Sequence, residues 1–595
     1  MLKKIKLSET FNILFKAYGR YKWQIVGMIL LGFLGGLFEG ISIGALIPLF
    51  SILVSNQMMA QDPISRSISA LFEYLPFSFS ITSLLALIVI LFTAKVLALL
   101  LFGQVRVRII SNYKRDMMRE LFEGALFARW GFLLQQKLGY LQSTFIRDVQ
   151  NGAGLFMSLG HAILAFTTLF MYFLVALNIS PMITLLTLGI GGVTLISLRP
   201  LVKIARHVAE DMSKLEKDTT QHINQYITGM KAVKSSAAET SVLKKGIVYL
   251  DSLRNLTVKS DLRRSLSTVF IQPASLIFIS MLFIFSYRDP YFNLAAFIAT
   301  IYLVQKIFLD VESIQRSFHA IADLLPYTAD AVELKEDFGK FKEENRGTEP
   351  FAFEKKIEFR DITFGYTPEK MVLDGLNLAI HKGEVLGLVG PSGGGKTSLA
   401  DLLLRLFRPG NGVILVDGKN VEGTDLKNWR DHLGYVSQDI FLLNDTIGQN
   451  IRFYREELTS DDIIEAAKKA NIYDFILSLK DGFETLVGER GVMLSAGQRQ
   501  RIVLARELAH RPEILILDEA TSSLDGESEM LIQKSINNLK STKTIFMIAH
   551  RLSTLVDVDR LLVLDKGKII EEGSPEELLA DPTSYFYRLY HIKEL

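Results

Sequence analysis

The sequence predicts a chain of two parts, a polytopic α-helical membrane domain followed by an α/β domain with a phosphate-binding loop. Three observations support this fold class. Long apolar runs are confined to the first half of the 595 residues. From Ile357 onward, short β-branched and Leu-rich runs alternate with helical stretches, which is typical of a largely parallel sheet. Within this second half, the string Gly390–Thr397, GPSGGGKT, fits the pattern G-x-x-x-x-G-K-[ST].

The composition narrows the classes of function. The net charge of +2 is too small to indicate nucleic-acid binding. The chain has no cysteine, which excludes disulfides, thiolate metal sites and a cysteine protease domain. The first apolar run is longer than the apolar region of a signal peptide and has no small-residue cleavage pattern, so we expect no cleavable signal peptide.

The first half is predicted to cross the membrane six times. Residues 7–20 precede the first span and place apolar side chains on one helical face, as in a helix that lies at the membrane surface. The candidate spans are 22–54, 82–103, 155–178, 180–198, 267–287 and 293–309.

Lysine and arginine gather at the N-terminus and in two long segments, 104–153 and 199–266. Cytoplasmic segments carry an excess of these residues, so we expect both termini to lie in the cytoplasm. We expect a multi-pass protein of the cell membrane, a bacterial inner or plasma membrane. The two long segments are predicted to continue the spans as helical extensions. Each has a break, at 129–131 and at 227–230, which indicates either a short transverse helix that meets a cytoplasmic domain or an ordinary helical hairpin turn.

Two charged residues, Glu39 and Lys95, lie inside predicted spans, where charges are costly. Glu39 lies about 15 residues from the outer end of the first span and Lys95 about 13 from the outer start of the second, which at about 1.5 Å per residue gives a similar depth. We therefore predict that they pair across adjacent helices. Such a pair has a structural role or contacts a substrate headgroup; the remaining alternative is that they do not meet.

Residues 336–350 are charged and punctuated by Gly and Pro, so 336–355 are assigned to a linker between a membrane domain, 1–335, and a nucleotide-binding domain, 356–595. In the second domain, 385–389 is predicted to form a buried strand and 398–407 a helix. Glycines let the loop between them direct its N–H groups at phosphate oxygens, and the helix dipole adds to the attraction. Lys396 is placed to reach the β- and γ-phosphates, and the Thr397 hydroxyl is placed to bind Mg²⁺.

A second motif is the apolar strand 514–517, which ends in Asp518 and Glu519. The carboxyl end of a strand is where a doubly wound sheet binds its ligand. Asp518 is therefore predicted to hold Mg²⁺, and Glu519 to orient or deprotonate the attacking water. A third string, Leu494–Gln498, precedes a predicted helix, 499–508, and offers a phosphate-binding helix N-terminus or an ordinary helix cap.

Taken together, these motifs resemble the nucleotide-binding domain of ABC transporters, and the whole chain resembles an exporter half-transporter of the lipid-flippase and multidrug type. The resemblance implies a polytopic helical membrane domain plus an α/β P-loop ABC ATPase domain, with ATP and Mg²⁺ as cofactors. The nucleotide-binding residues that it implies are Tyr366, which stacks on adenine, Gly390, Pro391, Ser392, Gly393, Gly394, Gly395, Lys396, Thr397, Ser398, Ser495, Gly497, Gln498 and Asp525. The implied catalytic residues are Glu519, His550 and Gln438, and the implied metal ligands are Thr397, Gln438 and Asp518.

In this family, ATP lies between the phosphate loop of one domain and the signature motif, here Leu494–Gln498, of another. With one nucleotide-binding domain per chain, the resemblance implies a second copy as partner in a homodimer, although a heterodimer stays open. Ala496 departs from the usual glycine, but Ser495 and Gly497 remain, and we expect active hydrolysis.

The expected cargo is an amphipathic substrate, a lipid or a lipid-linked oligosaccharide. The stretch 39–48 is similar to the first span of flippases for such molecules. Basic residues at the inner ends of spans, Arg254, Lys259, Arg263 and Arg264, either meet an anionic headgroup or only reflect the usual inward charge bias. A multidrug or peptide exporter and an ATP-gated channel or regulatory membrane module are the alternatives.

Overall fold

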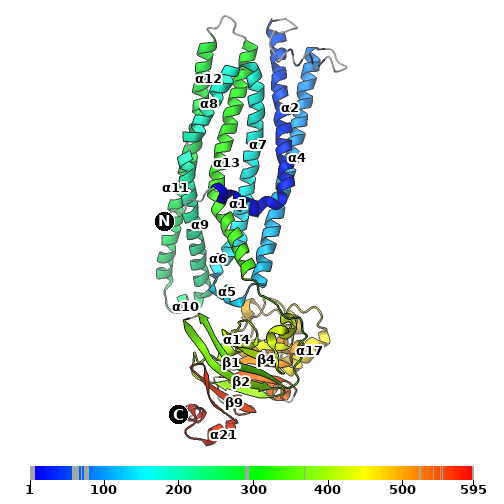
Figure 1. The fold of residues 1–595 in the computed structure, drawn as a ribbon, viewed down its shortest axis with the longest axis vertical. Helices are drawn as coiled ribbons and strands as arrows, with labels where there is room; N and C mark the ends of the chain where they lie inside the picture. The colour runs from blue at the N-terminus through cyan, green and yellow to red at the C-terminus, as the bar shows by residue number, and fades with distance from the viewer. Residues whose placement is uncertain are drawn as a thin grey trace. The chain divides into compact units, whose positions relative to one another are not determined.

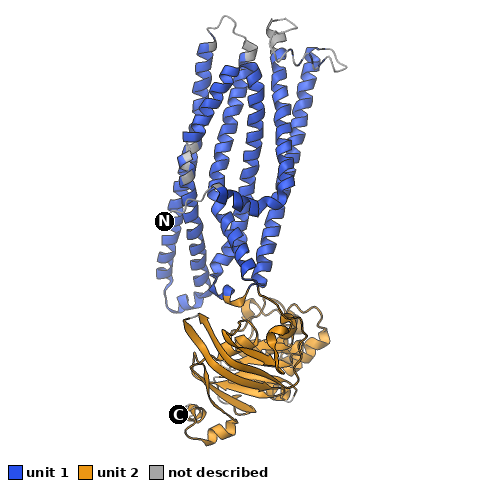
Figure 2. Ribbon diagram, viewed as in Figure 1, with its two compact units in different colours: residues 1–128, 132–342 blue, residues 129–131, 343–595 orange. Residues whose placement is uncertain are grey.

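A computed structural model describes residues 7–55, 66, 68, 70, 72, 79–197, 199–287, 294–367, 369–520, 524–540, 542–549, 551 and 554–592. The chain forms two compact units, which Figure 2 shows in different colours. Unit 1 contains residues 1–128 and 132–342, and unit 2 contains residues 129–131 and 343–595.

Unit 1 is helical. Its longest helices have the Leu-, Ile- and Phe-rich sequences expected in an apolar solvent, and the α2–α4, α2–α7 and α7–α13 pairs pack together, as Figure 1 shows. The helices are α1 (Leu7–Tyr18), α2 (Lys22–Ser55), α4 (Ile81–Leu126), α5 (Trp130–Gln135), α6 (Leu138–Ser143), α7 (Val149–Ile179), α8 (Pro181–Ser197), α9 (Arg199–Thr228), α10 (Met230–Ser235), α11 (Glu239–Val269), α12 (Ile271–Ser286) and α13 (Leu294–Lys340).

Five of the six predicted spans each overlap one of these helices, and α4, α7 and α13 continue well beyond the predicted bounds. The predicted span 267–287 covers the end of α11 and the whole of α12. Within the described residues, the helical stretches long and apolar enough to cross a membrane are Ser8–Leu49, Ile81–Leu126, Leu138–Ile179 and Glu239–Phe285, while the apolar Pro181–Ser197 is shorter. The chain is therefore a multi-pass membrane protein, and the total of six spans stays a prediction. At both predicted breaks the structure has a short helix, α5 and α10, rather than a plain turn.

Unit 2 contains the predicted parallel sheet. Its six strands lie in the order β10-β9-β3-β8-β7-β6, and all neighbours are parallel except β10 and β9. The central strands β3 (Val385–Val389), β7 (Ile514–Asp518) and β8 (Thr544–Ile548) are buried at every position, because helices and loops cover both faces of a parallel sheet. The other strands of this sheet are β6 (Leu433–Val436), β9 (Arg560–Asp565) and β10 (Lys568–Gly573).

A second sheet was not expected from the sequence. It is antiparallel, in the order β2-β1-β4-β5, with β1 (Lys356–Thr367), β2 (Lys370–His381), β4 (Asn411–Val416) and β5 (Lys419–Asn420). Its apolar face and one face of the parallel sheet share a core that includes Phe359, Leu386 and Phe546.

The helices of unit 2 are α14 (Lys396–Leu403), α15 (Leu426–Asp431), α16 (Ile447–Arg452), α17 (Ser460–Lys469), α18 (Tyr473–Ser478), α19 (Ala496–Ala509), α20 (Gly526–Leu539), α21 (Pro575–Ala580) and α22 (Tyr585–Ile592). The predicted helix 398–407 ends early, at Leu403, because Arg405 takes the left-handed conformation with a φ of 54°.

Candidate functional site

A cavity of about 460 Å³ lies at the carboxyl ends of β3 and β7. Tyr366, the phosphate-loop residues, Gln438 and Glu519, which are far apart in the sequence, all contribute to its wall. The full lining is Tyr366, Thr367, Lys370, Val372, Ser392, Gly393, Gly395, Lys396, Thr397, Ser398, Gln438 and Glu519. The structure therefore gathers most of the predicted nucleotide-binding residues into one site.

The phosphate loop requires glycine at two positions. Gly390 has a φ of 151°, and a Cβ there would lie 2.0 Å from the carbonyl oxygen of Leu564. Gly395 has a φ of 104°, and its Cβ would lie 2.8 Å from a methyl carbon of Leu373. Because α14 begins directly after Gly395, its free N–H groups and its positive dipole end face the cavity.

Lys396 is buried and its Nζ donates to the carbonyl oxygens of Gly390 and Pro391, at 2.9 Å each. Burial lowers the pKa of Lys396, and the nearby Glu519 and Asp518 oppose that shift. The desolvated ammonium has only neutral carbonyl oxygens as acceptors, and a charged phosphate oxygen would form a stronger hydrogen bond with it. The environment of Lys396 therefore favours an anionic ligand.

The residues present fit a Mg²⁺ ion. Asp518 is 3% exposed, and its Oδ1 atom is buried without a hydrogen-bond partner. Burial raises the pKa of Asp518, while a hydrogen bond with Thr397 opposes the shift. A bound cation would relieve this desolvated carboxylate, and Mg²⁺ in such sites takes one carboxylate, a hydroxyl and phosphate oxygens. Within the described residues there is no group of three or more His, Asp or Glu side chains that could hold a metal ion.

Glu519 follows β7 directly and has a φ of 53°, which is a strained conformation for a residue with a Cβ. The Gln438 Nε2 atom donates to the Glu519 Oε2 atom at 2.7 Å. This hydrogen bond joins Glu519 to Gln438, two of the residues that the resemblance implies to be catalytic. Their roles in catalysis stay predictions.

Tyr366 is 47% exposed and its ring packs edge-on against Phe364 and Phe407, with centroids 5.1 and 5.2 Å away. Its hydroxyl group also hydrogen-bonds to Ser398 at 2.9 Å and to Asp401 at 3.1 Å. The half-exposed ring therefore lines the cavity, and the two hydrogen bonds of its hydroxyl group fix its orientation.

Replacing Tyr366 by Ala is expected to raise the KM for ATP about 3- to 10-fold, since aromatic stacking contributes about 0.5–1.5 kcal/mol. Tyr366→Phe, which keeps the ring and loses both hydrogen bonds, is the matched control and is expected to raise it less than about threefold. ATPase assays over a range of ATP concentrations measure both values. A larger effect from Phe than from Ala would contradict the stacking role.

The signature residues do not line this cavity. Ser495 caps the N-terminus of α19 in a reciprocal pair, in which the Gln498 N–H donates to Ser495 Oγ at 3.2 Å and the Ser495 N–H to Gln498 Oε1 at 2.8 Å. At Gly497 a Cβ would lie 2.1 Å from the Ser528 Oγ, so no larger residue fits. Asp525 caps α20 with a single bond, in which its carboxylate accepts from the Ser528 N–H at 3.4 Å. These positions therefore have a structural role in the single chain, and their contact with nucleotide stays a prediction.

His550, which the resemblance implies to be catalytic, lies outside the described residues. Two residues that the sequence did not indicate belong to the site. The hydroxyl group of Tyr435 on β6 donates to Asp518 at 3.3 Å, and Asp401 on α14 accepts from Tyr366. Neither residue falls in a recognisable motif, and only their hydrogen bonds to Asp518 and Tyr366 in the folded chain identify them.

The predicted pair in the membrane unit is confirmed. Glu39 on α2 is 2% exposed, and Lys95 on α4 lies 2.7 Å from it. Lys306 on α13 also reaches Glu39, at 3.3 Å, and the hydroxyl group of Tyr172 on α7 donates to it. Close by, the Thr168 hydroxyl group donates to Asp310 at 2.7 Å. The pair is therefore part of a charged cluster that joins four helices.

Comparisons with known proteins agree with this architecture. A family model described as ABC transporter matches residues 373–522, and one described as ABC transporter transmembrane region matches residues 28–288.

Individual relatives match to different extents. YgaD of Bacillus subtilis, an ATP-binding/permease protein named for multidrug export, is 30% identical over 491 residues, which are 82% of this chain and 84% of that protein. An ATP-dependent lipid A-core flippase of Saccharophagus degradans is 44% identical over 236 residues, 40% of each chain. The solved structure of a bacterial Atm1-family ABC exporter with ATP bound has the same fold, with a TM-score of 0.80, 24% identity and coverage of 97% of this chain and 99% of that one.

Proposed function

The chain belongs to the ABC transporter family as an exporter whose ATPase domain binds ATP with Mg²⁺, and on that premise we propose that it moves a lipid or a lipid-linked oligosaccharide across the membrane by alternating access. Hydrolysis of ATP supplies the free energy for this movement. The working unit is a homodimer in the bacterial inner membrane, with both termini in the cytoplasm.

The observation that carries the cargo proposal is the charged cluster around Glu39. An amphipathic molecule needs apolar walls for its chains and a polar place for its headgroup. The helices of unit 1 supply the walls, while Lys95 and Lys306 remain 19% and 30% exposed although they pair with a buried carboxylate. With Glu39 and Asp310, the cluster offers two ammonium groups and two carboxylates, which suit a polar or phosphate-bearing headgroup. The similarity to a lipid A-core flippase supports a lipid cargo, although it covers only 40% of the chain.

In the proposed cycle each ATP is bound by the phosphate loop of one copy and the signature motif of the other. Lys396 and the N–H groups of α14 hold the phosphates. Thr397 and Asp518 would hold Mg²⁺, which would supply positive charge next to the transferring phosphoryl group. Glu519 orients the attacking water. Closure of the two ATPase domains favours the outward-open arrangement of the helices, and loss of the γ-phosphate contacts reverses it.

The test uses the purified protein in nanodiscs of defined lipid composition. We expect ATP hydrolysis to rise at least about twofold with a phosphate-bearing glycolipid or lipid-linked sugar, and mass spectrometry to find such a lipid bound after purification. Glu519→Gln serves as the control for contaminating ATPases. Stimulation only by cationic drugs or peptides would contradict the lipid cargo and favour the multidrug alternative that the name of YgaD suggests. Ion currents without turnover would instead indicate a channel.

A further inference from the structure

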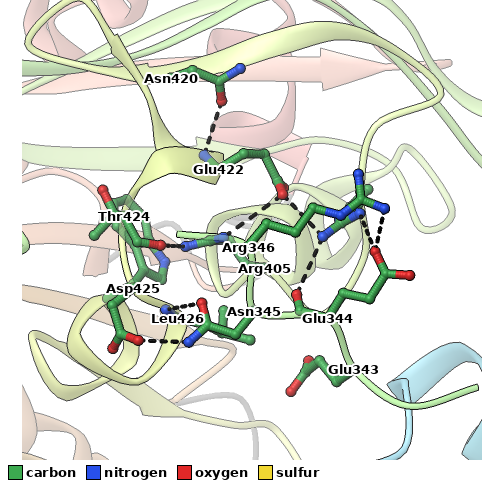
Figure 3. A network of polar contacts seen from close by, with 12 residues as sticks. Glu343, Glu344, Asn345, Arg346, Arg405, Asn420, Glu422, Thr424, Asp425 and Leu426 are labelled. Carbon is green, nitrogen blue, oxygen red and sulfur yellow. Dashed lines mark hydrogen bonds and ion pairs between the residues drawn. The ribbon is translucent and has the colours of Figure 1, made fainter. Parts of the chain in front are cut away.

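Residues 343–349, which we term the strap, are bound along their length to unit 2, although the sequence places them in a linker. The Arg430 guanidinium donates to both carboxylate oxygens of Glu343, at 2.7 and 2.9 Å. Asn345 donates to Asp425 at 2.6 Å and accepts from the Leu426 N–H at 3.0 Å, as Figure 3 shows. Paired contacts of this kind fix both position and orientation.

The backbone of the strap continues the attachment. The N–H groups of Thr348 and Glu349 both donate to the carbonyl oxygen of Gly423, at 3.0 Å. At Gly347 a Cβ would lie 2.1 Å from the carbonyl oxygen of Thr424, so only glycine permits this approach. A flexible tether needs none of these features, and the strap is therefore a built part of unit 2.

The strap is attached where α14, the helix of the phosphate loop, ends. Arg430, which holds Glu343, also donates to the carbonyl oxygens of Leu404 and Arg405, at 3.2 and 3.0 Å. Arg405 is 8% exposed and donates to the Thr424 carbonyl oxygen at 2.9 Å. The carboxyl end of α14 and the strap thus share Arg430 as a hydrogen-bond partner.

Glu344 of the strap forms ion pairs with arginines, one of which, Arg129, comes from a distant part of the chain. Its carboxylate lies 2.7 Å from Arg129, 2.5 Å from Arg346 and 3.7 Å from Arg408. Figure 3 labels Glu344 and Arg346 in this network. The hydrogen bond from Arg346 and the charges of Arg129 and Arg408 hold the pKa of Glu344 below its usual range. Arg129 belongs to residues 129–131, which include the first two residues of α5 and cluster with unit 2.

An apolar contact accompanies the ionic one. A Cβ on Gly131 would lie 3.0 Å from the ring of Phe407, so backbone and ring are in close contact. The same ring packs edge-on against Tyr366, at 5.2 Å between centroids. Phe407 therefore lies between residues 129–131 and Tyr366, the aromatic residue that lines the nucleotide cavity.

We propose that the strap is a coupling element, in which Glu344 is a positioning residue that holds Arg129 at the carboxyl end of α14. A shift of α14 on nucleotide binding is then passed to α5 through Arg129 and to α13, which ends at Lys340 just before the strap. This inference rests on the proposed coupling of ATP use to helix movement and adds the residues that carry it.

The test measures hydrogen–deuterium exchange of the α5 amides with and without a non-hydrolysable ATP analogue, which needs no knowledge of the cargo. Glu344→Ala, Arg129→Ala and the double variant are compared with Arg511→Ala. Arg511 forms a similarly exposed pair, 2.9 Å from Asp462, away from the strap.

We expect nucleotide affinity to stay unchanged in all four variants. The nucleotide-dependent change in α5 exchange should fall about threefold or more in each single variant, and the double variant should show no further loss, because both changes remove one interaction. Arg511→Ala should behave as the wild type. The proposal is overturned if α5 in the wild type does not respond to nucleotide, if its response survives Glu344→Ala, or if the two single effects add. If the exchange pattern is as expected but lipids do not stimulate ATP hydrolysis, the role of the strap stands and only the proposed lipid cargo is contradicted.

Discussion

Replacing Glu519 by Gln is expected to lower the rate of ATP hydrolysis by at least about 100-fold, because a positioned general base contributes about 10²- to 10⁴-fold. The amide keeps the size of the side chain and its contact with Gln438, which now lies 2.7 Å from the carboxylate. ATP binding should therefore survive, and the protein should accumulate with ATP bound. Measurements of phosphate release and of retained nucleotide after rapid desalting test both parts.

The same strand provides a matched control. Glu513 immediately precedes β7, as Glu519 follows it, and pairs with Lys382 at 3.2 Å on the surface. Glu513→Gln should leave hydrolysis within about twofold of the wild type, since surface substitutions change little. Hydrolysis at the wild-type rate in Glu519→Gln would remove the assigned base from the mechanism.

Replacing Glu39 by Ala is expected to destabilise the membrane unit by about 3 kcal/mol, the low end for breaking a buried ion pair. The change leaves Lys95 and Lys306 without their shared counter-charge, and Tyr172 without its acceptor. Their partial exposure limits the loss. Thermal unfolding of the protein in detergent, followed by intrinsic fluorescence, should show a lower midpoint.

An exposed glutamate of the same unit gives the control. Glu239 pairs with Lys234 at 3.0 Å and is 45% exposed, so Glu239→Ala should shift the midpoint little. Exchanging the charges, with Glu39→Lys and Lys95→Glu together, should recover part of the loss, because Lys306 can still meet a carboxylate nearby. An unchanged midpoint in Glu39→Ala would contradict a stabilising role for the cluster.

The nucleotide site could be predicted from the sequence because its parts are local. The backbone geometry of the phosphate loop requires glycine at Gly390 and Gly395, so the local sequence alone is enough to predict the loop. Asp518 and Glu519 directly follow the apolar run 514–517, and burial of a strand at every position is typical of a parallel sheet covered on both faces. Such patterns need no knowledge of distant contacts.

Other features depend on packing that no local pattern records. The depth of Glu39 and Lys95 along two helices was enough to predict their pairing, but the approach of Lys306 and Tyr172 depends on how α13 and α7 lie beside α2. Residues 343–349 are charged and Gly-containing, like a flexible linker, and only the positions of Arg430 and Thr424 turn them into a fixed strap. The antiparallel sheet was missed for the same reason, since its strands follow the general α/β alternation.

Hydrolysis by mixed dimers tests most directly whether two copies build each ATP site jointly. Lys396→Ala removes the phosphate contact in one copy, and Ser495→Arg blocks the signature motif in the other. If each site combines the loop of one chain with the signature of its partner, the mixed dimer retains one intact site and hydrolyses ATP well above either variant alone. If the mixed dimer is as inactive as the two parent variants, the sites do not form between chains and the account is wrong.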